Sequence, residues 1–501
     1  MKRAAFAAAV LFIATPVFAG GSVTAKRAAL STAHPLATKV GLSVLQRDGT
    51  AADAAVAVAL ALAVVQPKAG NLGGGGFLTY YEAQTRGVWT LDFRETAPRE
   101  ATKDSRTGVA AAGVPGTIAG LDALHKRFGS RPWKELIEPA VLLARDTRKD
   151  PSLPKGWPPR ELASTLRRLG DAGARDFYDG EIGNKLVEVV RAAGGSIGFR
   201  ELREYEPVWR APIKLVYGAY EIYSVPPPSG GALVLGETLN ILANDDLAKA
   251  GFQSTKAIHL LLEAQRRAFI DRDRYVADPA NVRIPYRELL SRRRADQWRE
   301  TIRTDRVIGT AMLAEPRQLN AEGEHTTHFT IVDSKGNIAA VTTTLGDDYG
   351  SGFIAPGLGF FLNNANADFG ATPNAIEPGK RAMSSLAPTI ILRDHKPYLA
   401  LGTSGGPAIP TTILQVFLNM VVYGKTLTAA MAAPRYHHGA VPDAMLAERD
   451  RAPKPTIDAL NALGHGVELR DAIGDVHAIL FENGRITAVA DPRGGGAAGG
   501  F

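Results

Sequence analysis

Two extended runs joined by a short turn lie in the second half of this 501-residue chain. Apolar and polar residues alternate over positions 328–332, and a second extended run covers 338–345. The sequence Ser-Lys-Gly-Asn at 334–337 supplies residue types that suit a tight turn. The pattern predicts a β-hairpin whose first strand begins at or beside Thr326. Because threonine is common in strands, this pattern alone assigns Thr326 no function.

Further hairpins and long helical stretches accompany this one. Residues 34–66 predict two helices broken at Gly49, and the polar, irregular stretch 306–324 leads into the central hairpin. Hairpins toward both ends, with helices between them, indicate a layered α/β fold. We also expect hairpins at 77–82 with 88–93 and 388–392 with 398–401, helices at 118–128, 233–242 and 410–422, and mainly helical structure over 133–250 and 255–303.

Several short motifs surround the central hairpin in a fixed order. They are Asp-Phe-Arg-Glu-Thr-Ala-Pro at 92–98, His-Thr-Thr-His at 325–328, Thr-Thr-Thr at 342–344, Leu-Asn-Asn at 362–364 with Asp368, Lys-Arg-Ala-Met-Ser-Ser at 380–385, and Ser-Gly-Gly at 404–406. This set of motifs resembles the γ-glutamyltranspeptidases, which belong to the N-terminal-nucleophile hydrolases. The motifs occur in the family's order and at nearly its spacing. The resemblance covers essentially the whole chain after the first twenty residues.

The chemistry of Thr326 can be stated from the residue itself. A neutral hydroxyl is a poor nucleophile and needs a base within hydrogen-bond reach. If the peptide bond between His325 and Thr326 is cut, Thr326 gains a free α-amine beside its own hydroxyl. An α-amino pKa of about 7.7–8.0 leaves part of that amine unprotonated near neutral pH. The cut would use the same hydroxyl, through an N-to-O acyl shift and hydrolysis. The resemblance implies this maturation, and the sequence permits it.

The resemblance also implies a fold, an activity and a set of residue roles. The fold would be the four-layer αββα sandwich, with segments 20–325 and 326–501 forming one interleaved catalytic domain and remaining together as a heterodimer. The activity would be hydrolysis of glutathione and other γ-glutamyl amides, or γ-glutamyl transfer to an amino acid or peptide, without cofactor or metal. The implied roles are Thr326 as nucleophile and base, Thr344 as its orienting partner, Gly405 and Gly406 as oxyanion hole, Arg94, Ser384 and Ser385 as ligands of the α-carboxylate, and Asp368 as ligand of the α-ammonium.

Three departures from the family pattern keep other substrates open. Gly346 stands where many members have asparagine, and Ala365 stands where they have glutamine or glutamate. The interval from Asp368 to Ser384 is short, so the loop that covers the pocket in some members is missing. An acylase for another side-chain amide, such as a glutaryl-type β-lactam acylase, is therefore an alternative on the same scaffold. A third alternative is an exported binding protein that never matures, against which the presence of Thr326 together with Arg94 and Asp368 argues.

The first nineteen residues predict an export signal. Lys2 and Arg3 form a charged start, residues 4–13 are apolar, and Val-Phe-Ala at 17–19 is a cleavage pattern of small residues. The apolar run is too short to span a bilayer, so we expect a periplasmic or secreted protein with no membrane span after signal removal. The chain has no cysteine, which excludes cysteine nucleophiles, thiolate zinc sites and iron–sulfur clusters.

Charge, histidines and glycines give no sign of other ligands. Lys2 and Arg3 carry two of the seven net positive charges, which leaves +5 on the exported chain. The basic stretch 292–306 is interleaved with acidic residues, so it predicts a solvated helix face rather than a nucleic-acid site. The pair His437-His438 lacks the spacing of a metal motif and is interpreted as structural. The glycine run in 71–77 matches no phosphate-binding motif and predicts close backbone packing near the active site.

Overall fold

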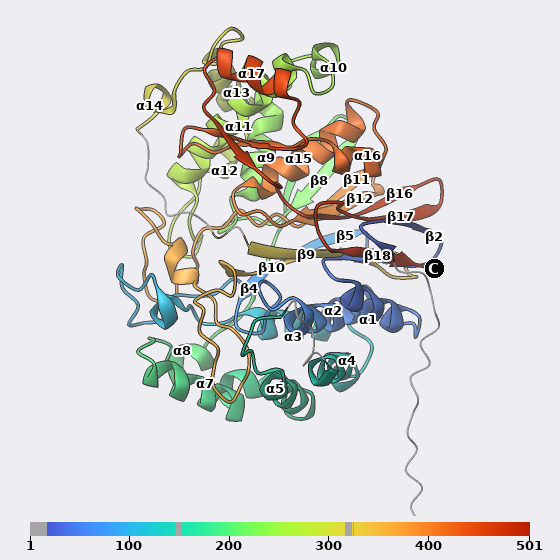
Figure 1. Cartoon of the computed structure of the whole chain (residues 1–501), viewed down its shortest axis with the longest axis vertical. Helices are drawn as coiled ribbons and strands as arrows, with labels where there is room; N and C mark the ends of the chain where they lie inside the picture. The colour runs from blue at the N-terminus through green and yellow to red at the C-terminus, as the bar shows by residue number, and fades with distance from the viewer. Residues whose placement is uncertain (1–17, 147–152, 316–322, 324) are drawn as a thin grey trace, which may run out of the picture.

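The structure is a computed structural model that describes residues 18–146, 153–315, 323 and 325–501. Two antiparallel sheets lie face to face across the middle of the molecule, and helices cover the outer face of each (Figure 1). This arrangement confirms the four-layer αββα sandwich.

The first sheet places the predicted hairpin near its centre. The hairpin consists of β9 (His325–Val332) and β10 (Ile338–Gly346), and Thr326 pairs with Thr344 across it. The complete strand order is β1 (Phe18–Ala19), β18 (Ala497–Gly500), β3 (Ala29–Thr32), β9, β10, β4 (Gly75–Glu82), β5 (Gly87–Asp92) and β6 (Val208–Arg210). Strands from before residue 325 therefore flank the hairpin on both sides.

The second sheet is interleaved in the same way. Its strand order is β2 (Ser22–Ala25), β17 (Arg485–Ala490), β16 (Val476–Glu482), β12 (Lys396–Thr403), β11 (Thr389–Arg393), β8 (Tyr220–Ser224) and β7 (Ile213–Tyr217). Strand β11 pairs with β8, and β17 pairs with β2, so early and late parts of the chain meet here too. The predicted hairpin at 388–401 corresponds to β11 and β12.

The helices of the outer layers follow from local sequence. Helices α1 (Pro35–Leu45) and α2 (Ala51–Val65) cover the first sheet and are separated near Gly49, as predicted. Every residue of α2 is buried, because α4 (Trp133–Asp146) packs over its other side. At its start Thr50 and Asp53 form a reciprocal capping box, which satisfies two otherwise unpaired N–H groups. Helices α9 (Gly231–Ile241) and α15 (Ala408–Val421) cover the second sheet.

The remaining elements surround this core. The other helices are α3 (Thr117–Phe128), α5 (Pro159–Ala172), α6 (Asp176–Asp179), α7 (Glu181–Ala192), α8 (Phe199–Arg203), α10 (Leu247–Ala250), α11 (Thr255–Tyr275), α12 (Tyr286–Leu289), α13 (Arg292–Glu300), α14 (Thr310–Leu313), α16 (Leu427–Ala432) and α17 (Lys454–Ala462). A small third sheet contains β13 (Tyr436–His438), β14 (Met445–Glu448) and β15 (Val467–Arg470).

Two of the predicted helical stretches are only partly helical. The prediction for 133–250 is wrong over 208–224, where the chain forms β6, β7 and β8. The burial of β7 alternates between buried and exposed residues, which is the period of a strand with one buried face. The second stretch, 255–303, divides into α11, α12 and α13, with a proline-containing loop after Tyr275.

Most of the predicted export signal, residues 1–17, lies outside the described part of the chain. The last two residues of the signal form β1, which pairs with Ala497 and Ala498 of β18. Over 18–146, 153–315 and 325–501, no helix has the length and apolar character needed to cross a membrane. Of the expected linker before Thr326, residues 316–322 and 324 also fall outside the described residues.

Candidate active site

A chain of hydrogen bonds joins Thr326 to the peptide bond that precedes it. The Thr326 hydroxyl donates to Oγ1 of Thr344 at 3.4 Å, and the Thr344 hydroxyl donates to the carbonyl oxygen of His325 at 2.9 Å. The backbone N–H of Gly346 donates to the same Thr344 oxygen at 2.8 Å. Thr326 and Thr344 are both buried. The attacking hydroxyl and the carbonyl that it would attack therefore share one partner, Thr344.

Backbone packing fixes the position of Thr344. In the register of the first sheet Thr344 pairs with Gly75, and Nδ2 of Asn71 donates to the Thr344 carbonyl at 3.2 Å. A Cβ added to Gly74 would lie 2.2 Å from that carbonyl oxygen, which leaves room only for glycine. The glycine run therefore packs closely beside the site, as the sequence analysis expected.

The end of β12 lies at the same end of the sandwich as Thr326. Gly402 faces His328 across the two sheets, since a Cβ at Gly402 would lie 2.4 Å from the His328 ring. Two residues earlier, Ala400 packs in one apolar cluster with Val332, at the far end of β9. Strand β12 therefore runs toward the beginning of β9, where Thr326 lies.

Gly405 and Gly406 follow β12 after one residue, Ser404. Their φ angles are +117° and +53°, a region that favours glycine. Their carbonyls accept from Ala408 and Ile409 at the start of α15. Within the described residues, neither glycine N–H donates to a backbone or side-chain acceptor. Both donors are thus available to an anionic oxygen at this end of the sandwich.

Arg94 lies at the centre of a buried ionic cluster. Its Nη2 donates to Oδ2 of Asp368, and its Nη1 lies 3.2 Å from Oε2 of Glu95. Only 2% of the Arg94 side chain and 5% of the Asp368 side chain are exposed. Burial raises the pKa of Asp368, and the positive charge of Arg94 opposes that rise. Burial also raises the pKa of Glu95 to about 7, again against the charge of Arg94.

Short contacts along the chain place this cluster beside Thr344, the partner of Thr326. A Cβ at Gly75 would lie 2.8 Å from Oε2 of Glu95, and Gly75 is the partner of Thr344. An antiparallel bridge between Thr96 and Arg381 brings the segment of Arg94 alongside the segment that ends in Ser384 and Ser385.

The two serines use their oxygens as acceptors inside the protein. Oγ of Ser384 accepts from the N–H of Leu386 at 3.1 Å, and Oγ of Ser385 accepts from Nη2 of Arg272 at 2.9 Å. Neither hydroxyl has another hydrogen-bond partner in the described part of the chain. Both hydroxyl hydrogens are therefore available to an external acceptor such as a carboxylate.

Two of the three departures noted in the sequence, Gly346 and Ala365, are built into the backbone. Gly346 has φ +98°, and an added Cβ would lie 1.9 Å from Oδ1 of Asn364. An asparagine at 346 would therefore strain this turn as well as adding a polar group. Ala365 is buried, and its N–H donates to Oδ1 of Asn363 at 3.0 Å.

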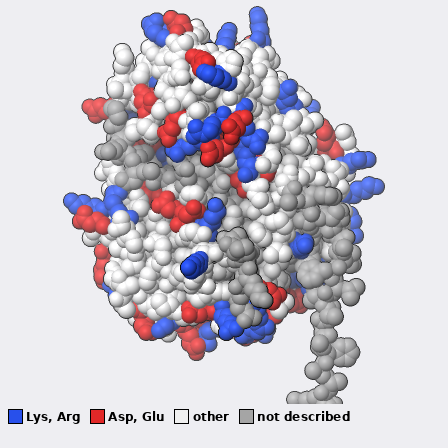
Figure 2. All heavy atoms as spheres, viewed as in Figure 1, with Lys and Arg blue, Asp and Glu red and all other residues white. Residues whose placement is uncertain are grey.

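The residues that the sequence analysis interpreted as structural are tied into the core. Nδ1 of His437 lies 3.0 Å from Oγ1 of Thr411, and burial lowers the pKa of His437 to about 3. Burial likewise lowers the pKa of His438 to about 3. Among the described residues, no group of three or more histidine, aspartate or glutamate side chains is placed to hold a metal. On the face seen in Figure 2, basic and acidic side chains are intermingled.

Three site residues carried no assigned role from the sequence. Nδ2 of Asn71 donates to the Thr344 carbonyl. Asn71 stands at the start of the glycine run, and this position in the sequence is a signal for its role. Asn363 binds the carbonyls of Gly73 and Gly113 and thereby joins two loops. Arg272 reaches Ser385 from the middle of a long helical pattern, where nothing in the local sequence distinguishes it.

Comparisons with known proteins agree with the motifs. A sequence model of the family described as Gamma-glutamyltranspeptidase matches residues 37–149 and 153–501. The glutathione hydrolase proenzyme of Escherichia coli (strain K12) is 34% identical, over 94% of this chain and 91% of that protein. The Acylase ACY 1 proenzyme of Pseudomonas sp. (strain V22) is 32% identical, over 93% and 92%. A solved cephalosporin acylase from Bacillus halodurans superposes with a TM-score of 0.83 at 25% identity, over 96% and 97%.

Proposed function

The chain belongs to the gamma-glutamyltranspeptidase family, and on this premise we propose that it is a self-processing γ-glutamyltransferase and glutathione hydrolase. The observation that carries the proposal is the hydrogen-bond chain from the Thr326 hydroxyl through Thr344 to the carbonyl of His325. This chain has the parts needed for attack on the preceding peptide bond. It also positions the hydroxyl that would later attack a substrate.

Maturation would proceed as an intramolecular acyl transfer. The Thr326 oxygen attacks the carbonyl carbon of His325, while the Thr344 hydroxyl stabilises the developing charge on the carbonyl oxygen. The C–N bond then breaks, which leaves an ester on Thr326 and a free α-amine. Water hydrolyses the ester and releases His325 as a carboxylate. The products are a segment from about residue 20 to 325 and a segment of 326–501.

In the mature enzyme the new α-amine would act as the base for its own hydroxyl. The Thr326 oxygen attacks the γ-carbonyl of the donor, and the N–H groups of Gly405 and Gly406 stabilise the oxyanion. The leaving amine takes the proton, and a γ-glutamyl ester remains on Thr326. Water or an acceptor amine then attacks this ester and regenerates the enzyme. Each step is acyl transfer, for which these residues suffice without a cofactor.

The buried ion pair supports a zwitterionic head group as ligand. Without substrate, Arg94 and Asp368 compensate each other's charge. A γ-glutamyl group would separate them, placing its α-carboxylate at Arg94 and its α-ammonium at Asp368. Ser384 and Ser385 would donate their hydroxyl hydrogens to the same carboxylate. One ion pair would thus be exchanged for two, and no buried charge would lose its partner.

A glutaryl acylase is the second candidate, because related proteins include acylases. A glutaryl group brings a carboxylate but no ammonium. Binding it at Arg94 would leave Asp368 buried without its cation, which costs about 3–5 kcal/mol when a buried pair is broken. The ion pair therefore favours the γ-glutamyl substrate. This argument opposes the acylase alternative that Gly346 and Ala365 kept open.

Export to the periplasm or outside the cell is part of the same proposal, supported by the pattern in residues 1–19. A binding protein that never matures is disfavoured, because it would have no need of a buried hydroxyl aligned with the preceding carbonyl.

The test compares kcat/KM for γ-glutamyl-p-nitroanilide and glutaryl-p-nitroanilide. For the natural protein we expect the γ-glutamyl substrate to be preferred at least about 100-fold, from the cost of an unpaired buried charge. Asp368→Asn removes the charge but keeps the shape. It should lower the γ-glutamyl value and reduce the preference to within roughly tenfold, since the glutaryl group then leaves no charge unpaired.

Asp171→Asn is the control, because Asp171 is a surface carboxylate of α5 that pairs with Lys134 and not with Arg94 or Asp368. It should leave the preference unchanged. A natural preference for the glutaryl substrate would move the acylase ahead. Release of p-nitroaniline from neither substrate would contradict both candidates.

A further inference from the structure

Arg272 connects helix α11 to the predicted carboxylate site. It is buried, with 4% of its side chain exposed. Its Nη2 donates to Oγ of Ser385 at 2.9 Å, and its Nη1 donates to Oδ1 of Asp273 at 2.8 Å. A Cβ added to Gly230 would lie 2.6 Å from Cγ of Arg272, so the backbone at the start of α9 packs tightly against the side chain. The guanidinium is therefore held from several directions.

This contact decides which way the Ser385 hydroxyl points. A serine hydroxyl can donate or accept, but a guanidinium can only donate. Against Arg272 the Ser385 oxygen must accept, so its own hydrogen has to find another acceptor. The described residues provide none. Ser384 is set in the same way by the N–H of Leu386. A carboxylate, which only accepts, is the ligand that two such hydroxyls match.

We propose that Arg272 is a positioning residue that fixes Ser385 as a hydrogen-bond donor to the donor substrate's α-carboxylate, and so selects substrates in which that group is free and ionised. The identity of the substrate rests on the function proposed above. Arg272 acts through Ser385, whereas Arg94 meets the carboxylate directly.

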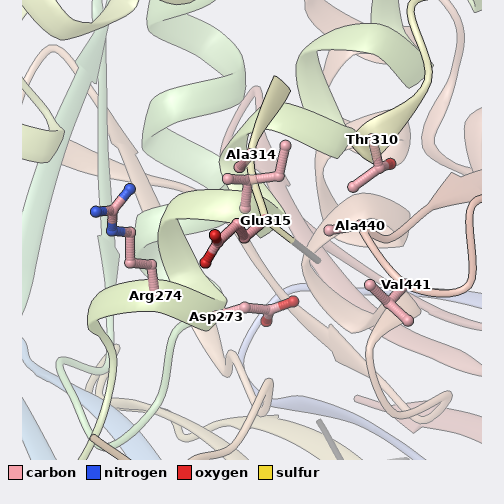
Figure 3. A pocket seen from close by; sticks show the side chains of 8 residues that line it. Asp273, Arg274, Thr310, Ala314, Glu315, Ala440 and Val441 are labelled. Carbon is pink, nitrogen blue, oxygen red and sulfur yellow. The ribbon is translucent and has the colours of Figure 1, made fainter. Parts of the chain in front are cut away.

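Charge and surroundings agree with this role. Burial raises the pKa of Asp368, and the positive charges of Arg94 and Arg272 both oppose that rise, so the field of Arg272 reaches the substrate site. On its other side, Asp273 lines a separate pocket of about 180 Å³ with Arg274, Thr310 and Glu315 (Figure 3). Arg272 thus contacts both Asp273, which lines that pocket, and Ser385 of the carboxylate site. Asp273 holds one of its nitrogens while the other serves Ser385.

The test is a double-mutant cycle with two substrates. Arg272→Met, Ser385→Ala and the double variant are compared on γ-glutamyl-p-nitroanilide and on its analogue with an α-carboxamide. We expect Arg272→Met to raise KM for the acid about tenfold, as for loss of a hydrogen bond to a charged group. The change in KM for the carboxamide and in kcat should be small. In the Ser385→Ala background, Arg272→Met should add no more than roughly twofold, the error of additivity between independent sites.

Two further variants separate this role from a structural one. Arg272→Lys keeps a positive donor and should recover part of the lost affinity for the acid. Arg274→Met removes a neighbouring arginine that lines the separate pocket, and it should leave KM for both substrates unchanged.

Equal losses on acid and carboxamide, or losses that add in the double variant, would overturn the inference. Failure of both Arg272→Met and Arg272→Lys to fold or to self-cleave would overturn it too, since Arg272 would then serve the fold. If the natural protein turned over neither γ-glutamyl compound, the proposed function itself would fail, and this inference with it.

Discussion

The two parts of the site, one at Thr326 and one at Arg94, differ in charge. In the described part of the chain, the hydroxyls of Thr326 and Thr344 bond with each other and with backbone groups, at distances of 2.8–3.4 Å. Around Arg94 there are buried charges that compensate one another. Neutral groups need no charged partner when no ligand is bound, so the hydroxyls of Thr326 and Thr344 can be aligned in the free protein. A buried charge without a partner is unfavourable, so Arg94 and Asp368 pair with each other until a ligand replaces these internal partners.

Removing the nucleophile should have the largest effect and acts only on the hydroxyl end. Thr326→Ala should give one uncut chain without activity, because both the cut and the later acyl transfer need the same oxygen. Intact mass of the purified protein distinguishes one chain from two fragments that meet between His325 and Thr326. Processing of the variant at the same bond would show that another group attacks.

Neutralising a charge should act only on the ionic end. As pH rises, an unfolded chain loses the Glu95 proton near pH 4.3, while the folded protein holds it until about pH 7. Between these values the folded state binds the extra proton, so increasing pH lowers the free energy of unfolding, by about 4 kcal/mol over the whole window. Glu95→Gln should remove this loss. Urea unfolding at pH 5 and pH 8, in the uncut Thr326→Ala background, measures it, and identical pH dependence in both proteins would contradict the prediction.

A change where the two ends meet should have the smallest effect. Gly346 gives its N–H to Thr344 and packs against Asn364, in a conformation that costs a side-chain-bearing residue about 1–3 kcal/mol. Gly346→Ala should therefore slow self-cleavage about tenfold or more, by displacing the donor to Thr344. The time course of fragment appearance during refolding measures this. Normal cleavage would mean that Thr344 is held well enough by the Gly74 loop alone.

Local patterns were sufficient to predict the elements that carry the reacting groups. The hairpin of Thr326, the break at Gly49 and the strand pair of β11 and β12 follow from alternation and turn residues. Strands β6, β7 and β8 were missed because they are short and lie between helices, where their alternation spans few residues.

Contacts between distant segments could not be predicted in this way. The family resemblance implied separate ligands for Arg94 and Asp368, and only the structure shows that they pair with each other. Arg272 and Ser385 are 113 residues apart, and no periodicity relates them. The positive φ at Gly346 depends on where Asn364 folds back, so the sequence showed a missing side chain but not the reason for it.

The strand order determines what a cut between residues 325 and 326 would leave behind. Strands β9 and β10 would remain hydrogen-bonded between β3 and β4, and β11 would remain beside β8. Separating the two pieces would require strands to leave both sheets, so dissociation on dilution would be slow. Fragments synthesised separately would each have to insert strands between the strands of the other, in both sheets. A chain that is cut after folding avoids this step.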